Sequence, residues 1–241
     1  MLGLGLVGLA FPAWYGDAWV HGAASGVRGS LGGDVVRELE AAQQFGGLGS
    51  VVVVVLIVVL MDRGRCRRLL DLVAAWGLTG LVVLVLKLGI GRPRPKFGDA
   101  EILLWPWGAY PLPDADPPGV YHAWELWAPI SSDLWSMPSS HTSAAVALAV
   151  WLGVVYPRLR PLVVGWVVLV GASRVLFGAH YLSDVFVGAG VALLVAWPAA
   201  RGYWGVRFLD WVWVRAVDRT AEPALPGLLE REGATVGERR E

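Results

Sequence analysis

Long stretches without charged residues dominate the first 200 positions of the chain. These stretches are residues 1–16, 41–61, 72–86, 142–157, 161–173 and 185–200. A helix that crosses a bilayer needs about 20 mostly apolar residues. Residues 41–61 reach that length without any charge, and the other stretches reach it only with a charged residue near one end. The valine-rich runs do not alternate with polar residues, so they do not fit strands of a membrane barrel. The pattern predicts an all-α integral membrane bundle of six helices.

The segments that flank this bundle are more polar. We predict a short first membrane helix over residues 1–16 and an amphipathic interfacial helix over residues 33–44. Residues 45–200 form the membrane domain itself. Residues 201–217 alternate aromatic with charged side chains and predict a second interfacial helix, and residues 218–241 predict a disordered cytoplasmic tail.

One long segment, residues 91–137, separates the third and fourth predicted helices. It holds more than half of the 15 prolines and five of the 14 tryptophans. A connection of this length is unusual in a compact domain. Proline keeps the segment out of a helix, and tryptophan favours the boundary between lipid and water. We expect either a packed cap over the helix ends or a lid that contacts the substrate, and the two are compatible.

Composition agrees with a single membrane domain. The 241 residues are 56% hydrophobic and 17% charged, with 20 basic and 20 acidic residues. Soluble domains have about 25% charged residues. The single cysteine excludes a disulfide scaffold. A net charge of zero without a basic block argues against nucleic-acid binding.

Arginines predict the orientation in the membrane. Residues 62–68 carry four arginines and residues 156–161 carry two. Four more follow the last span, at Arg201, Arg207, Arg215 and Arg219. With six spans all three segments fall on one face, which the positive-inside rule assigns to the cytoplasm. We expect a bacterial or archaeal plasma membrane protein with its opposite face outside.

Scarce charges gather at that external face. Lys87, Arg174 and Asp184 lie at or near the ends of predicted spans, where a charge is costly and indicates a functional site by default. Arg94 follows Lys87 closely in the chain. So much positive charge in one place indicates a bound anion. Taken singly, Lys87 and Arg174 also fit side chains that extend to the lipid headgroups.

Two further elements at this face fit phosphate chemistry. Ser139, Ser140 and His141 stand at the predicted start of the fourth helix, where free backbone N–H groups favour an anion. His180 and Asp184 are four residues apart, so the carboxylate can hold Nδ1–H and leave Nε2 free as base or nucleophile. His141 is then available as a general acid. Alone, these elements also fit an ordinary N-cap and a structural hydrogen bond.

Three runs of residues at this face together form a family pattern. The run KLGIGRPRP from Lys87 resembles the K-x6-R-P motif of the type 2 phosphatidic acid phosphatases. The run PSSH that ends at His141 resembles their P-S-G-H motif, and SRVLFGAHYLSD, which ends at Asp184, is similar to S-R-x5-H-x3-D. The resemblance covers about residues 45–200. The superfamily also contains soluble vanadium haloperoxidases.

Two positions need comment. The spacing selects Arg94 rather than Arg92 as the arginine of the first motif, which leaves Arg92 behind the phosphate-binding residues. Ser140 departs from the family, because glycine is usual there. Its backbone N–H survives the change, but the phosphate needs room beside the added side chain.

The resemblance implies roles for eight residues. The phosphate-binding residues are Lys87, Arg94, Ser139, Ser140 and Arg174. The catalytic residues are His180 as the nucleophile that forms a phosphohistidine, Asp184 as its orienting carboxylate, and His141 as the acid that protonates the leaving oxygen. No metal or other cofactor is implied, because the cations supply the electrostatic stabilisation.

The expected function is hydrolysis of a lipid phosphate or diphosphate, with polyprenyl diphosphate, phosphatidylglycerophosphate and phosphatidate as candidate substrates. The expected partners are this lipid and the bilayer, with no nucleic acid, while the oligomeric state stays open. One alternative is a phosphotransferase that uses the same phosphohistidine. Another is a non-catalytic lipid-phosphate binding or transport protein. Haloperoxidase chemistry is disfavoured by the apolar spans.

Overall fold

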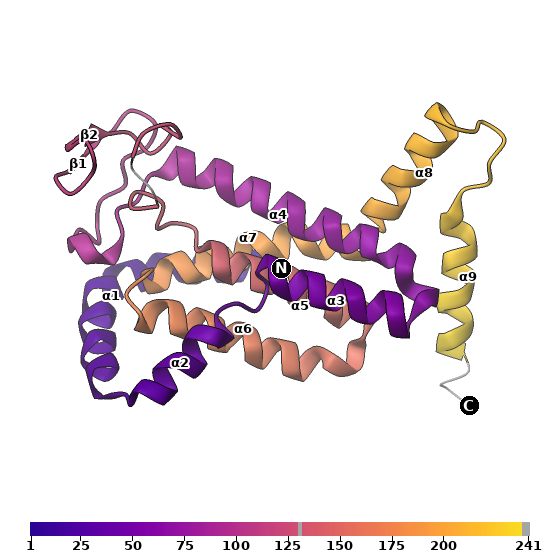
Figure 1. Ribbon diagram of the computed structural model, residues 1–241, viewed down its shortest axis with the longest axis horizontal. Helices are drawn as coiled ribbons and strands as arrows, with labels where there is room; N and C mark the ends of the chain where they lie inside the picture. The colour runs from indigo at the N-terminus through magenta and orange to yellow at the C-terminus, as the bar shows by residue number, and fades with distance from the viewer. Residues whose placement is uncertain (130–131, 238–241) are drawn as a thin grey trace.

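The computed structural model describes residues 1–129 and 132–237 and is mostly helical (Figure 1). The longer helices are α1 (Leu2–Ser30), α2 (Gly33–Ala42), α3 (Leu48–Met61), α4 (Leu69–Ile90), α5 (Ser140–Val155), α6 (Arg160–Leu176), α7 (Leu182–Arg201), α8 (Trp204–Ala216) and α9 (Ala224–Gly237). The short 3-10 turns are η1 (Arg63–Arg68), η2 (Pro95–Phe97) and η3 (Pro157–Leu159). Strands β1 (Tyr110–Leu112) and β2 (Gly119–Tyr121) form an antiparallel hairpin, which the all-α prediction did not include.

Three helical segments of the described chain are long and apolar enough to cross a membrane. They are Arg63–Ile90, Pro157–Leu176 and Leu182–Arg201, which contain α4, α6 and α7. Helices α3 and α5 are apolar but shorter. The predicted third, fifth and sixth spans therefore have helices of sufficient length, while the total of six spans stays a prediction.

Helix α5 occupies the centre of the bundle, in contact with α4, α6 and α7. Its alanines and valines are buried on nearly every side, and Trp151 is fully buried. The Trp151 indole N–H donates to the carbonyl of Arg68 over 2.8 Å, which ties α5 to the start of α4. Small side chains let the surrounding helices approach, so the N-terminus of α5 is held firmly among them.

The N-terminal helix is longer than predicted. A first helix was expected over residues 1–16, but α1 continues to Ser30. Figure 1 shows α1 running beside α7 and then turning away at the end of the molecule that carries the hairpin, and α1 packs more extensively against α7 than against any other helix. The amphipathic helix expected over residues 33–44 is present as α2, which packs against α6.

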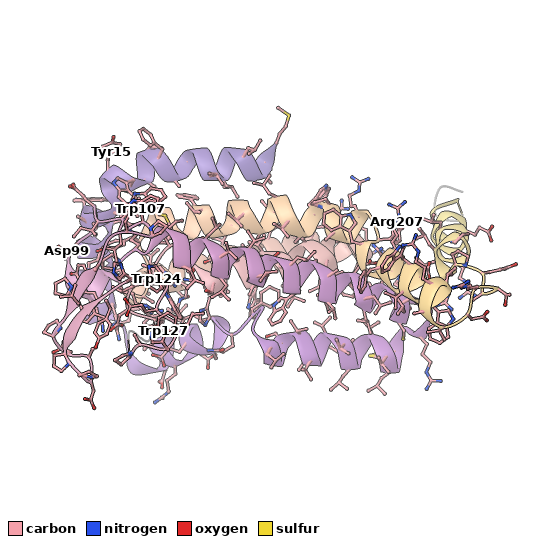
Figure 2. All side chains as sticks on the ribbon, turned by 90° about the horizontal axis from the view of Figure 1, so that it is seen from above. Tyr15, Asp99, Trp107, Trp124, Trp127 and Arg207 are labelled. Atoms are coloured by element: carbon pink, nitrogen blue, oxygen red, sulfur yellow. The ribbon has the colours of Figure 1, made fainter. Side chains whose placement is uncertain are left out.

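The long connection between α4 and α5 is a packed cap. It has its own small core, formed by Leu104, Tyr110, Leu112, Ala123 and Leu134. Figure 2 shows Trp107, Trp124 and Trp127 of this cap at one end of the molecule and Arg207 at the other. Burial of these apolar side chains holds the cap in one conformation above the helix ends.

The C-terminal segment agrees with the prediction only in part. A helix is present where the interfacial helix was expected over residues 201–217, namely α8, while its place at the membrane interface stays a prediction. Disorder was expected from residue 218, but α9 forms over Ala224–Gly237. The Asp210 carboxylate of α8 accepts hydrogen bonds from the amides of Ala224 and Leu225, each over 3.0 Å. This contact satisfies amides at the start of α9 from another helix, so the local composition of the tail could not reveal it.

Candidate active site

The end of α4 delivers the first group of charged residues. Gly91 terminates α4 with a left-handed backbone at φ 58°. A Cβ at Gly91 would lie 2.7 Å from the Cβ of Ala123 in the cap, so glycine is required both for the conformation and for the close approach. The chain then turns back over the helix end, which places Arg94 within electrostatic range of Lys87.

Backbone pairing joins this turn to the segment before α5. The amide of Ser136 donates to the carbonyl of Arg92 over 2.9 Å, and the amide of Arg94 donates to the carbonyl of Asp133 over 2.9 Å. Arg92 and Trp135 form a parallel bridge. Two motifs more than 40 residues apart in sequence therefore lie side by side.

The start of α5 meets the start of α7. Ser139 is the N-cap of α5, and its hydroxyl oxygen accepts from the Thr142 hydroxyl over 3.0 Å. The Ser139 amide donates to the backbone carbonyl of Asp184 over 3.1 Å. Gly188 of α7 permits this contact, because a Cβ there would lie 2.8 Å from the Ser139 carbonyl oxygen. Ser139 is fully buried and does not line the cavity described next, so its part in the structure is to position the helix start.

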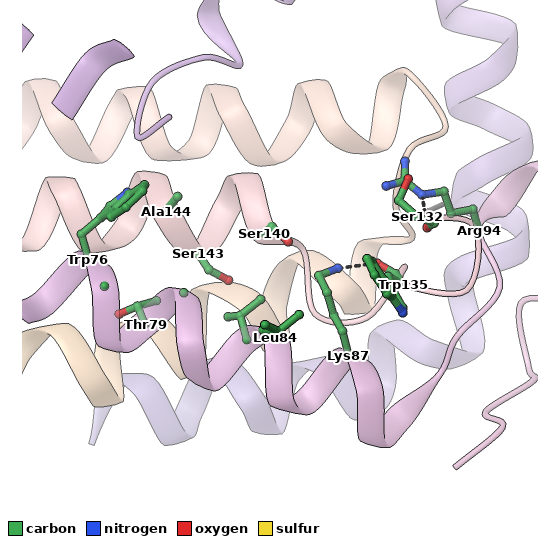
Figure 3. A pocket seen from close by; sticks show the side chains of 13 residues that line it. Trp76, Thr79, Leu84, Lys87, Arg94, Ser132, Trp135, Ser140, Ser143 and Ala144 are labelled. Carbon is green, nitrogen blue, oxygen red and sulfur yellow. Dashed lines mark hydrogen bonds between the residues drawn. The ribbon is translucent and has the colours of Figure 1, made fainter. Parts of the chain in front are cut away.

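A cavity of about 370 Å³ opens beside these segments (Figure 3). One end is polar, with Lys87, Arg94, Ser132, Trp135 and Ser140 in its wall. Lys87 Nζ donates to the Trp135 carbonyl, and Arg94 Nε donates to the Ser132 carbonyl over 2.8 Å. Burial lowers the pKa of Arg94, which lies outside the helices. The cap thus orients both cations toward the cavity.

The rest of the cavity follows α4 and α5 into the bundle. Its wall is formed by Trp76, Gly77, Thr79, Gly80, Val83, Leu84, Ser143 and Ala144. The Thr79 hydroxyl donates to Ala75 O over 2.7 Å and the Ser143 hydroxyl to Ser139 O over 2.7 Å. Because these polar groups are satisfied within the helices, the wall presents a mostly apolar surface.

Arg174 and His141 lie within electrostatic range of the polar end but do not line the cavity. Arg174 Nη1 donates to Oε1 of Gln43 over 2.7 Å, and its buried Nε has no hydrogen-bond partner in the described part of the chain. His141, half-buried in the first turn of α5, lies within electrostatic range of Lys87, Arg94 and Arg174. The backbone amides of Ser140 and His141 donate to no group among the described residues. Three cations and two amides are therefore available to one anion.

Two acceptors lie near the ring of His180. Its Nδ1 lies 2.7 Å from the carbonyl oxygen of Ser136, but 3.7 Å from Oδ2 of Asp184. That carboxylate oxygen already accepts from the Ser136 hydroxyl over 2.6 Å and from the Tyr181 amide over 2.9 Å. The Ser136 carbonyl is thus the nearer partner of Nδ1, while the Asp184 carboxylate lies within ion-pair distance, and Ser136 also links the two side chains.

The surroundings of His180 fix its protonation. The ring is 2% exposed, and burial lowers the pKa of His180 to about 3. The imidazole is thus neutral at pH 7. A carbonyl oxygen can only accept, so the ring proton lies on Nδ1 and the lone pair lies on Nε2. A neutral imidazole with Nε2 free is the form required of a nucleophile.

The structure separates the two arginines of the first motif. Arg94 lines the cavity, whereas Arg92 is fully buried behind it. Arg92 donates to Asp184 Oδ1 over 2.6 Å and to Asp17 Oδ2 over 2.8 Å. The choice of Arg94 by spacing agrees with this placement. Asp17 and Gln43 were missed by the sequence reasoning, and only Asp17 left a signal, as the first charge after the apolar N-terminal stretch.

A helical bundle of apolar segments, with cations clustered near two histidines, defines the class of a helical membrane protein with a cationic site. Residues 68–208 match the family model of the PAP2 superfamily, and the chain belongs to this superfamily. This finding confirms the resemblance drawn from the three motifs.

Individual relatives share shorter regions. The chain is 31% identical over 128 residues to a lipid A 1-phosphatase of Rhizobium johnstonii, which covers 51% of this chain and 44% of the relative. It is 31% identical over 111 residues to a lipid A 1-phosphatase of Rhizobium etli, covering 46% and 39% of the two chains. The matched regions thus span less than half the length of these curated relatives.

A solved structure shows the same fold. The crystal structure of Aquifex aeolicus LpxE aligns with a TM-score of 0.52 and 17% identity, over 74% of this chain and 93% of that chain. At this identity the likeness concerns the fold alone.

Proposed function

We propose that this protein is a membrane-bound phosphatase that hydrolyses the phosphate or diphosphate monoester of a lipid through a phosphohistidine on His180. The observation that carries the proposal is the cavity, which joins a cationic end at Lys87 and Arg94 to an apolar groove between α4 and α5. Lys87 and Trp76 are 11 residues apart on α4, so the groove follows the helix for about 16 Å. A phosphate attached to a hydrocarbon chain matches both parts.

The first half of the proposed reaction forms the phosphohistidine. The Nε2 lone pair of His180 attacks phosphorus, and the bond from phosphorus to the lipid oxygen breaks. The negative charge of the bound phosphate favours the protonated form of His141, which then donates its proton to that oxygen, so that the lipid leaves as a neutral alcohol or as a monophosphate. Lys87, Arg94 and Arg174 stabilise the charge that develops on the phosphoryl oxygens.

The second half releases phosphate. Water attacks phosphorus, His141 takes a proton from that water, and the bond between phosphorus and Nε2 breaks. Throughout, the Ser136 carbonyl accepts from Nδ1–H and keeps the ring oriented. Among the described residues no group of three or more His, Cys, Asp or Glu side chains is placed to hold a metal ion. We propose that Lys87, Arg94 and Arg174 supply the electrostatic stabilisation that a metal ion provides in other phosphatases.

The substrate is a lipid with an accessible phosphate, and a panel of lipids tests this proposal. Polyprenyl diphosphate, phosphatidylglycerophosphate and phosphatidate are candidates, and lipid A 1-phosphate joins them because two similar proteins are named lipid A 1-phosphatases. We expect the purified full-length protein in detergent to release inorganic phosphate from at least one of these lipids, with EDTA present. Loss of the release under EDTA would contradict the metal-free mechanism.

Substitution of His180 tests the nucleophile. We expect His180→Ala to lower the rate by at least about 10³-fold, on the order of the loss of a covalent nucleophile. His122→Ala, in the cap and outside the cavity wall, serves as the matched control and should keep the rate within about threefold. An active His180→Ala protein overturns the assignment.

The same assay separates the alternatives. Radiolabel that passes from the lipid to an added alcohol or sugar instead of water indicates a phosphotransferase. Binding of the lipid phosphate without release of label indicates a binding or transport protein. The intact His180 and the buried Asp184 favour turnover over binding alone.

A further inference from the structure

Helix α1 lies outside the residues matched by the family model, yet it brings a charge into the site. The match begins at residue 68, whereas Asp17 belongs to α1. Its carboxylate is fully buried in contact with groups from two other parts of the chain. Oδ2 accepts from Arg92 Nη2 over 2.8 Å, and Oδ1 accepts from the Ser183 amide over 3.0 Å. The Ser183 hydroxyl also donates to Oδ2.

Arg92 stands between two carboxylates. Its Nη1 donates to Asp184 Oδ1 over 2.6 Å and to the Ser183 hydroxyl oxygen over 2.7 Å. Its guanidinium carbon lies 4.0 Å from the ring centre of Trp14 and 4.2 Å from that of Tyr181. Two aromatic rings and two carboxylates therefore fix the guanidinium in position and orientation.

These contacts continue to the nucleophile. Arg92 donates to Oδ1 of Asp184, and Oδ2 of the same carboxylate accepts from the Ser136 hydroxyl over 2.6 Å. The carbonyl of the same serine accepts from His180 Nδ1 over 2.7 Å. An unbroken series of hydrogen bonds thus runs from Asp17 through Arg92, Asp184 and Ser136 to His180.

We propose that Asp17 is a positioning residue for the reaction: it holds Arg92, and through Asp184 and Ser136 it keeps the His180 ring in the Nδ1–H form with Nε2 free. The inference rests on the proposed function for its catalytic consequence, but not for its structural content. Among the described residues, the Ala100 carbonyl is the one partner that Arg92 Nη2 keeps without the Asp17 carboxylate. The Arg92 guanidinium is then less constrained, so Asp184, Ser136 and the His180 ring can shift.

Kinetics give the first test. In Asp17→Asn, which keeps the shape and removes the charge, we expect kcat to fall at least tenfold while KM for the lipid changes less than threefold, because no phosphate contact is lost. Leu6→Ala is the matched control, since Leu6 packs α1 against the hydrophobic core without touching the polar series. It should lower Tm and leave kcat per folded molecule unchanged.

The second test needs no turnover. Nitrogen-15 spectra of histidine-labelled protein in detergent report the tautomer of each ring, and His180→Gln assigns the His180 signals. We expect the wild type to show His180 with the proton on Nδ1 and Asp17→Asn to show a mixture of both tautomers. If Asp17→Asn does not fold, Ser183→Ala is the second variant, because it removes the hydroxyl between Asp17 and Arg92. It should also give a mixture of His180 tautomers, with a smaller share of the Nε2–H form.

The outcomes are distinguishable. An unchanged His180 tautomer in folded Asp17→Asn overturns the proposal, whatever its kcat. A mixed tautomer together with lowered kcat supports it. If the wild type releases no phosphate from any lipid, the proposed function fails, while the tautomer measurement still decides the role of Asp17.

Discussion

Arg92 and Arg94 are two residues apart and carry the same charge, but their surroundings give them different tasks. Arg94 lines the cavity, and among its nitrogens Nε donates to a carbonyl of the described chain, that of Ser132. Arg92 is enclosed by two carboxylates and two rings. The side chain of Arg94 therefore has donors available for a ligand, whereas Nη1 and Nη2 of Arg92 already donate to groups of the protein.

This difference gives a prediction for single substitutions. Arg94→Gln should lower kcat/KM by about 100-fold or more, on the order of the loss of a charge-assisted contact to the transition state, with Tm near that of the wild type. Arg92→Gln should destabilise the protein by about 3–5 kcal/mol, because it leaves two buried carboxylates without their cation. Steady-state kinetics and thermal unfolding in detergent measure both effects. The reverse pattern, with a stable Arg92→Gln and an unstable Arg94→Gln, contradicts the assignment.

The motifs identified most of these residues, but not their contacts. Spacing alone selected Arg94, and the structure places it in the cavity wall. Spacing also suggested a direct bond from His180 to Asp184, because residues four apart share a helix face. In the structure His180 precedes α7, which begins at Leu182, so its Nδ1 lies nearer to the Ser136 carbonyl, at 2.7 Å, than to the Asp184 carboxylate, at 3.7 Å.

At the scale of elements, two glycines of α4, Gly77 and Gly80, leave open space in the groove between α4 and α5. A Cβ added at Gly77 or Gly80 meets no other atom within 4 Å, so a larger side chain enters open space. Both residues line the cavity. The hydropathy of α4 predicted a span, but it could not show which of its faces meets a cavity, because the whole segment is apolar.

Filling this groove tests its use. Gly80→Leu should lower activity at least tenfold on a long-chain lipid phosphate and change activity less than threefold on a short-chain, water-soluble phosphate, because only the hydrocarbon path is blocked. Gly165→Leu on α6, where the added Cβ also meets no other atom, is the matched control for the helix substitution. An equal loss of activity on both substrates would show that the groove does not bind the hydrocarbon chain of the lipid.

At the scale of the whole molecule, the two ends differ in structure: one carries the cap, and the other carries the arginine-rich η1 with α8 and α9. The hairpin of the cap lies at one end, and α8 and α9 lie at the other (Figure 1). The polar end of the cavity lies beside the cap, where Lys87 and Arg94 bind cap carbonyls, and η1 contacts α8. The arginine-rich η1 belongs to this second end and fits a cytoplasmic face. We therefore propose that the cavity opens on the external side of the membrane.

Labelling of single cysteines tests this orientation. In a Cys66→Ser background, Trp107→Cys places a thiol on the exposed cap and Gly64→Cys places one in exposed η1. A membrane-impermeant maleimide added to intact cells should label the first and spare the second, and both should react after the membrane is opened. The opposite pattern in intact cells reverses the proposed orientation.

The sequence by itself determined the membrane character, the helices that became α4, α6 and α7, and the residues of the three motifs. Hydropathy, motif spacing and the placement of arginines are local properties, which can be read along the chain. Only the tertiary structure decided the contacts of Asp17, Gln43 and Ser136, whose partners lie 166, 131 and 44 residues away. A buried hydrogen bond depends on which groups packing brings together, and no local pattern records that.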